Sequence, residues 1–374
     1  MHFALSDPAK KKSFITGTVG GQVQASGQDQ DGRVAQASAY YHWLPVWVGE
    51  AAVLSGKPDE KLRSLGDEVF RRELVGGLRV RVLRDGMFIF DFSGWMPGRI
   101  LSDIGRTPSD WETAEATILC RVALMNAHLS CLYTAVGRMQ DWHLDKMALT
   151  VPRIFQMQSF EDDHGLCRDP ALVALTLGRH PVYYTSGLPL DFDWRLAHRA
   201  MTVEQTTLEE SFVLLDSILR KENASSVLIL VELLTRACKA YEDHDFNSAL
   251  ITSWTVTENL LRTKWERYIV NTRARQFAGE EFESVDPRCR ASPSKLRAYK
   301  VSEIADFLSS KGELPPVLYE DVSASRKVRN DWMHKLGTVG REDAEKAVDA
   351  AQRLLDLVED LELRVPLRVT LHGL

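Results

Sequence analysis

One short segment in the C-terminal part of the chain carries the residue types needed to break a phosphodiester. Arg329 and His334 lie five positions apart in the segment 326–337, which reads Arg-Lys-Val-Arg-Asn-Asp-Trp-Met-His-Lys-Leu-Gly. An arginine stays ionised and can hold the negative charge that builds on phosphorus. A histidine titrates near neutrality and can move the proton of a ribose 2′-hydroxyl or of the leaving oxygen. The pair therefore indicates metal-free RNA cleavage.

The spacing alone does not distinguish this pair. An arginine followed after four to six residues by a histidine also occurs at Arg121 and His128 and at Arg138 and His143, about as often as chance predicts. Arg121 and His128 fall inside an expected long helix, which favours a structural role. Arg138 and His143 cross the expected end of that helix, which favours the surface.

A helical wheel sets the third pair apart. At about 100° per residue, the segment has an apolar stripe and an opposite, mainly polar stripe, with Arg329 and His334 on the two shoulders. The apolar stripe consists of Val328, Trp332, Leu336 and Val339, and the polar stripe of Arg326, Asn330, Met333 and Gly337. Asn330 and His334 are one turn apart, and Gly337 has no side chain to keep another backbone away. This pattern predicts a polar face suited to a cleft between two helices or two protomers.

The motif Arg329-Asn330-x-x-x-His334, preceded by Arg326 and followed by Gly337 and an acid-started helix, resembles the signature of the HEPN superfamily. The resemblance implies an all-helical domain, frequently a two-fold dimer with both motifs facing one cleft. It often implies a ribonuclease used in toxin, antiphage or RNA-processing systems, although some members only bind nucleotides or proteins.

The helices expected before the motif, at about 225–241 and 246–268, follow the order of that family's bundle. The resemblance covers roughly residues 204–362.

Each residue of the motif has an expected role. His334 is the expected general acid or base, and Arg329 is expected to stabilise phosphate charge, with Arg326 in support. Asn330 is expected to orient His334 or a phosphate oxygen, because its amide both donates and accepts hydrogen bonds. Glu258 either fixes Arg329 by a charge-assisted hydrogen bond or is a solvent-facing helix acid.

Composition and cysteine usage indicate a soluble protein. The chain has 374 residues, 44% of them hydrophobic and 26% charged, which is ordinary for globular proteins and long enough for two domains. No apolar run approaches the roughly 18 residues needed to span a bilayer, and the N-terminus lacks the apolar stretch of a secretory signal. The five scattered cysteines suit a reducing compartment. We therefore expect a cytoplasmic protein without membrane attachment.

The charge pattern is compatible with a local nucleic-acid site, but not with a protein that covers nucleic acid over a large surface. The net charge of −6 argues against a protein that covers nucleic acid by electrostatics. Ten basic residues against five acidic ones between positions 262 and 300 either line a phosphate track or form a solvated helix end and loop. His164 and Cys167, just after two aspartates, have metal-ligand types that a surface turn also uses. We expect no metal and no other cofactor.

The chain is expected to be α+β. A mainly β N-terminal domain with one long helix is expected over residues 1–190, and an all-α, HEPN-like helical bundle over residues 204–374. Alternating apolar residues around Asp85-Gly86 predict a hairpin with a two-residue turn. Tyr40 to Val48 predicts a strand in which Pro45 marks an edge or a bulge.

Helix signals dominate the rest of the chain. A capping box at Ser109 to Glu112 predicts a long helix to about Gln140 whose buried face includes Leu119. Further helices are expected at about 204–221, 224–242, 245–270, 300–310, 315–337 and 341–362.

Two functions are compatible with this sequence. The first is a metal-independent endoribonuclease that acts by 2′-hydroxyl attack, in a toxin or antiphage defence protein whose N-terminal domain senses or binds a regulatory ligand or protein. The second is a non-catalytic module that dimerises or binds a nucleotide or protein. The combination of Arg329, Asn330 and His334 favours the first, because a binding module needs no such combination. A homodimer through the helical domain is expected from the polar face and Gly337.

Overall fold

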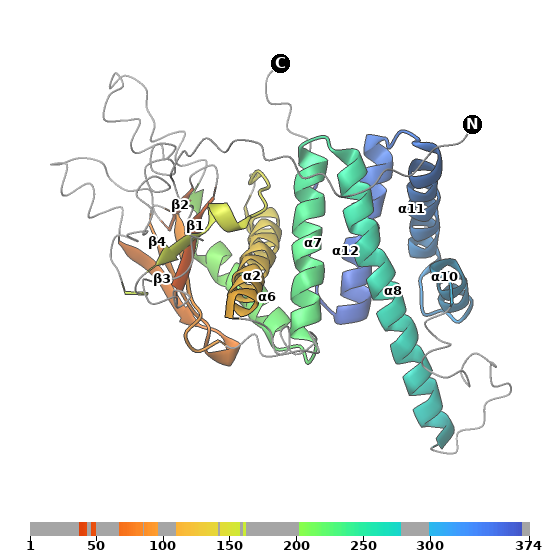
Figure 1. Cartoon of the computed structure of the whole chain (residues 1–374), viewed down its shortest axis with the longest axis horizontal. Coiled ribbons are helices and arrows are strands. Elements are labelled where there is room, and N and C mark those ends of the chain that lie inside the picture. Colours follow the sequence, from red (N-terminus) through yellow and green to blue (C-terminus); the bar gives the residue numbers. More distant parts are fainter. Residues whose placement is uncertain are drawn as a thin grey trace, which may run out of the picture.

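The computed structural model describes residues 37–42, 46–49, 67–84, 86–95, 110–140, 143–157, 160–161, 202–277 and 299–368. Within these ranges a small antiparallel sheet and a larger group of helices form an α+β fold, as the sequence predicts. The sheet lies at one end of the molecule and the helices extend away from it (Figure 1).

The larger sheet has five antiparallel strands in the order β3-β4-β5-β1-β6. They are β1 (Ala37–Tyr41), β3 (Glu68–Glu73), β4 (Arg79–Leu83), β5 (Met87–Asp91) and β6 (Phe155–Met157). Strands β4 and β5 form the predicted hairpin, with Val82 opposite Phe88. The connection spans residues 84–86, one residue more than expected. Gly86 is required there, because its φ is +84° and a Cβ would collide with the Val46 carbonyl oxygen.

Both faces of this sheet are buried at β1, β4 and β5, whose residues are buried at successive positions, whereas the edge strand β3 is mostly exposed. One face contributes Tyr40, Val80, Val82, Phe88 and Phe90 to the main core. The other face contributes Ala39, Leu83, Met87, Ile89 and Phe155 to a smaller core. The alternation follows from the two-residue period of a strand.

The single strand predicted from Tyr40 to Val48 is wrong. Strand β1 ends at Tyr41 and lies inside the sheet, between β5 and β6. Trp47–Val48 forms β2, which pairs in parallel with β7 (Thr202–Val203) in a second sheet. Pro45 itself lies outside the described residues. A proline cannot donate a ladder hydrogen bond, so it is unfavourable within an interior strand such as β1.

The long helix α2 (Asp110–Met139) matches the helix predicted from the capping box. It packs against two further helices, α6 (Gln205–Leu219) and α7 (Ala224–Glu242), and both α2 and α6 contact the sheet, through His128 and Phe212. By length and composition its part Glu115–Met139 could cross a membrane, but 83% of the apolar window is buried inside the protein. These apolar side chains therefore form core contacts. Leu119 departs from the predicted buried face, since it is 51% exposed.

The Arg121 and His128 pair on α2 is structural, as predicted. The Tyr40 hydroxyl lies 2.9 Å from Nδ1 of His128, and the imidazole stacks on Phe212 with ring centroids 4.3 Å apart. Burial lowers the pKa of His128 to about 3, so the ring is neutral. The guanidinium of Arg121 is buried over the Phe92 ring. Neither residue faces solvent.

The helices of the C-terminal part follow the predicted order. After α6 and α7 come α8 (Phe246–Phe277), α10 (Val301–Ser310), α11 (Pro316–Lys335) and α12 (Arg341–Glu359). Helix α8 is longer than expected and continues into a segment predicted to be irregular. Helices α7, α8 and α12 pack against one another, and α11 lies on α8 and α12 (Figure 1).

One apolar core is continuous from the sheet through α2 and α6 to the later helices. The described parts of the two predicted domains therefore share buried contacts. The proposed boundary between residues 190 and 204 falls largely on residues outside the described ranges, and the division stays a prediction.

Candidate functional site

Helix α11 carries the predicted motif at its C-terminal end. His334 lies in the last turn, four residues after Asn330. The helix ends where Leu336 takes the left-handed conformation, with φ of 51°. The backbone N–H of Leu336 donates to the carbonyl oxygens of Asp331 and Trp332. The motif therefore lies at a helix end whose carbonyl dipoles favour positive charge.

The opposite side of α11 is held against the bundle. Val322 is buried, and Val328 and Trp332 pack on the main core, as the wheel predicts. Arg353 of α12 forms an ion pair with Asp321. These contacts fix the orientation of the helix and therefore the direction of the motif face.

The helical-wheel prediction is wrong beyond the last residue of α11. Leu336, expected on the apolar stripe, is 86% exposed, because the left-handed residue ends the helical periodicity. Gly337 was expected to admit a second backbone. The backbone it approaches is that of its own helix, where its N–H donates to the Asp331 carbonyl oxygen at 3.3 Å. Val339 is buried as predicted, although it lies outside the helix.

Arg326 and Arg329 differ from most arginines of these helices, because no carboxylate pairs with them among the described residues. The paired arginines are Arg220, Arg236, Arg262, Arg267, Arg353 and Arg364. Arg329 Nη1 instead donates to Asn330 Oδ1 at 3.1 Å. Both motif arginines are half-buried. A guanidinium that is partly desolvated without a counter-ion favours an anionic ligand.

His334 has an exposed side chain, and no hydrogen-bond or ion-pair partner within the described ranges. The adjacent Lys335 is paired with Asp331 at 2.6 Å. Arg329, Asn330 and His334 lie within about one and a half turns of the same helix. An exposed imidazole can exchange protons with a ligand.

Glu258 does not support Arg329 in this structure. Its carboxylate pairs with Arg262, one turn later on α8, at 3.0 Å. Of the two readings of Glu258, the structure agrees with a helix-surface acid and does not show the bond to Arg329. Other basic side chains of the expected phosphate track are also neutralised, since Lys264 pairs with Glu313 and Arg267 with Glu359.

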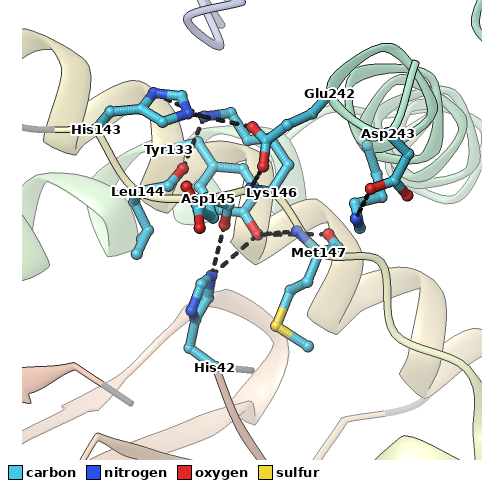
Figure 2. Close-up of polar contacts among 10 residues, drawn as sticks. His42, Tyr133, His143, Leu144, Asp145, Lys146, Met147, Glu242 and Asp243 are labelled. Atoms are coloured by element: carbon cyan, nitrogen blue, oxygen red, sulfur yellow. Dashed lines mark hydrogen bonds and ion pairs between the residues drawn. The ribbon is translucent and has the colours of Figure 1, made fainter. Parts of the chain in front are cut away.

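A second polar cluster lies where the segment after α2 crosses the end of α7 (Figure 2). His143 Nε2 lies 3.1 Å from Glu242 Oε2, and the backbone N–H of Lys146 donates to Glu242 Oε1 at 2.7 Å. The Lys146 ammonium donates to the Leu144 carbonyl oxygen at 2.8 Å and lies 3.5 Å from both ring nitrogens of His143. Asp145 completes the cluster. The expected surface position of His143 is wrong, since its side chain is only 12% exposed.

The electrostatics of this cluster follow from its burial. Burial lowers the pKa of Lys146 to about 8, although the carboxylates of Glu242 and Asp145 oppose this shift. Burial alone would raise the pKa of Glu242, but hydrogen bonds from His143 and from the Lys146 backbone lower it overall. Glu242 is therefore ionised at neutral pH.

Sequence reasoning missed this cluster because its halves are distant in the chain. Glu242 lies 99 positions from His143, and no local pattern links them. The sequence signal that could have indicated the cluster is the order His143-x-Asp145-Lys146 just after the end of the long helix. The other metal-type cluster considered from the sequence, around His164 and Cys167, lies outside the described residues.

No protein-family model matches this chain, and no curated protein or solved structure matches it.

Proposed function

We propose that this protein is a HEPN-type endoribonuclease that cleaves RNA at the C-terminal end of α11. The observation that carries the proposal is the pairing of two properties on one helix. Arg329 is half-buried and has no carboxylate partner among the described residues, and His334 is exposed in the last turn. Together they offer an anion site and a proton-transfer group in the same place.

The reaction that this pair suits is attack of a ribose 2′-oxygen on the adjacent phosphorus. The P–O5′ bond breaks, a 2′,3′-cyclic phosphate forms, and the 5′-oxygen leaves with a proton. His334 takes the 2′-hydroxyl proton or supplies the proton of the leaving oxygen. Arg329 holds the charge of the phosphorane, and Asn330 positions Arg329 through its side-chain oxygen. Arg326 is a second cation for the RNA backbone.

The wider assignment rests on the helix order. Helices α7 and α8, followed by α11 with the motif and then α12, agree with the bundle that the HEPN resemblance implies. In this proposal a second copy faces the motif, the N-terminal part senses or regulates, and the protein acts in the cytoplasm as a toxin or antiphage effector.

A second function, a non-catalytic module that binds protein or nucleotide, is favoured by a different observation. Met333 and Leu336 flank His334 and are 49% and 86% exposed. Exposed apolar side chains beside a polar motif suit a contact surface. In that case the motif residues would bind and not cleave.

The test is cleavage of defined RNA by tag-free protein in excess chelator. We expect cleavage to persist, DNA and 2′-O-methyl RNA to resist, and the 5′ fragment to end in a 2′,3′-cyclic phosphate or its hydrolysed form. Loss of activity in chelator with recovery in magnesium or manganese would indicate a metal-assisted nuclease instead. No cleavage under any condition would favour the binding module.

The proposed dimer is tested separately. Sedimentation at micromolar concentration should show a two-fold assembly. A monomer whose activity does not depend on concentration would contradict it.

A further inference from the structure

The cluster at the end of α7 contains three metal-type side chains that the proposed nuclease does not use. The ligand atoms of His143, Asp145 and Glu242 all lie within 4.8 Å of one another. Asp145 and Glu242 are each 8% exposed. Figure 2 shows these side chains converging from the segment after α2 and from α7.

The separation of the His143 and Glu242 ligand atoms fits a shared cation. His143 Nε2 and Glu242 Oε2 are 3.1 Å apart. Two ligands bound at 2.0–2.1 Å to one tetrahedral Zn²⁺ are separated by roughly 3.3 Å. A cation between these atoms would thus need little movement of either side chain. The Asp145 carboxylate, whose ligand oxygen lies within 4.8 Å of the other two ligand atoms, would move closer to supply the third ligand.

The backbone around the cluster is fixed by buried hydrogen bonds. His42 Nε2 lies 2.9 Å from the Asp145 carbonyl oxygen, and the Met147 N–H donates to the Tyr133 hydroxyl at 2.7 Å (Figure 2). The Lys146 N–H donates to the second oxygen of Glu242 at 2.7 Å. This last bond is an outer contact that orients a ligating carboxylate.

The cluster already attracts a positive charge. The Lys146 ammonium is buried beside the His143 ring, and its other contacts are the Leu144 carbonyl oxygen and the face of the Tyr133 ring at 4.8 Å. The carboxylates of Asp145 and Glu242 therefore lie in the same cluster as this ammonium. An ammonium on a flexible four-carbon stem can move aside when a stronger cation enters.

We propose that His143, Asp145 and Glu242 form a three-ligand site for a first-row divalent cation, with Zn²⁺ the best fit, in competition with the Lys146 ammonium. One imidazole and two carboxylates are a donor set that suits Zn²⁺ better than Mg²⁺, which prefers oxygen and retains its waters. The metal would tie the segment after α2 to the end of α7. This role is structural and separate from α11, so it leaves the proposed cleavage chemistry unchanged.

The first test is metal uptake by the full chain without a tag. Chelator-stripped protein is dialysed against buffered Zn²⁺ and its metal content measured, with Mg²⁺ as the comparison. We expect one tightly held Zn²⁺ in the wild type and at least tenfold weaker binding in His143→Gln and in Glu242→Gln. Asp243→Asn, which changes the exposed carboxylate next to Glu242, should bind like the wild type. Circular dichroism confirms that each variant is folded.

The second test uses the competing ammonium. Lys146→Met removes the resident charge and keeps the length of the side chain, so its affinity for Zn²⁺ should rise several-fold. Equal zinc content in the wild type, His143→Gln and Glu242→Gln would overturn the proposal, as would no zinc uptake in either the wild type or Lys146→Met.

Discussion

An imidazole and a basic side chain lie close together at the end of α11, and again where the segment after α2 crosses the end of α7. The two regions differ in the burial and the hydrogen bonding of these groups. At the crossing, His143 and Lys146 are buried and hydrogen-bonded to Glu242 or to backbone. On α11, His334 is exposed, and among the described residues the side chain of Arg329 hydrogen-bonds only to Asn330. The buried cluster stabilises the fold, and the α11 face is open to a ligand.

The comparison shows that residue type alone does not indicate function. His128, His143 and His334 each follow an arginine at similar spacing. His128 is fully buried and neutral, His143 is bonded to a carboxylate, and His334 is exposed. Only the position of each ring in the fold separates a core residue from a group that can transfer protons to a substrate.

The largest effect is expected from breaking the buried cluster. Glu242→Ala leaves the His143 ring and the backbone N–H of Lys146 without their partner, and should lower the free energy of unfolding by about 3 kcal/mol. Asp243→Ala, at the adjacent exposed position, should change it by about 0.5 kcal/mol or less. Urea unfolding of the two variants measures the difference. Similar losses at both positions would show that the cluster is not a stabilising centre.

An intermediate effect is expected at His128 and depends on pH. Burial lowers its pKa in the folded state to about 3, so below the unfolded value near 6.5 only the unfolded chain binds the proton. Stability is therefore present above about pH 6.5 and is lost as pH falls towards 3. Between pH 6.5 and 5, the wild type should lose about 2 kcal/mol more than His128→Gln. Parallel pH profiles from chemical denaturation would contradict this.

The smallest effect on stability is expected at the α11 motif. His334→Asn should change the free energy of unfolding by about 0.5 kcal/mol or less, because the exposed ring has no partner among the described residues. A loss comparable to that of Glu242→Ala would mean that His334 has a structural role.

Much of the fold could be predicted from local patterns. The apolar period and the helix boundaries located α6, α7, α10 and α12 within a few residues, because each helix has its own amphipathic face. The hairpin was also predicted, since Gly86 marks its turn. The division of the Tyr40 to Val48 segment between two sheets was not, because it depends on partners in distant strands.

The two candidate sites also differ in how far a local sequence pattern predicts them. The α11 motif is contiguous, so Arg329, Asn330 and His334 could be recognised together. The exposed end at Leu336 could not, because a left-handed residue interrupts the helical period without a glycine at that position. The His143 and Glu242 pair depends on the packing of α2 against α7, which no local sequence pattern indicates.

The central claim is that the open face of α11 performs chemistry, and one matched pair of variants tests it most directly. His334 and His244 are both exposed, and His244 has φ of 62°, a conformation that asparagine tolerates. The same exchange, histidine to asparagine, can therefore be made at either position. We expect His334→Asn to lower the rate of RNA cleavage at least 100-fold in chelator, and His244→Asn to cleave like the wild type. Equal cleavage rates in the wild type and His334→Asn, with both proteins folded, would contradict the account.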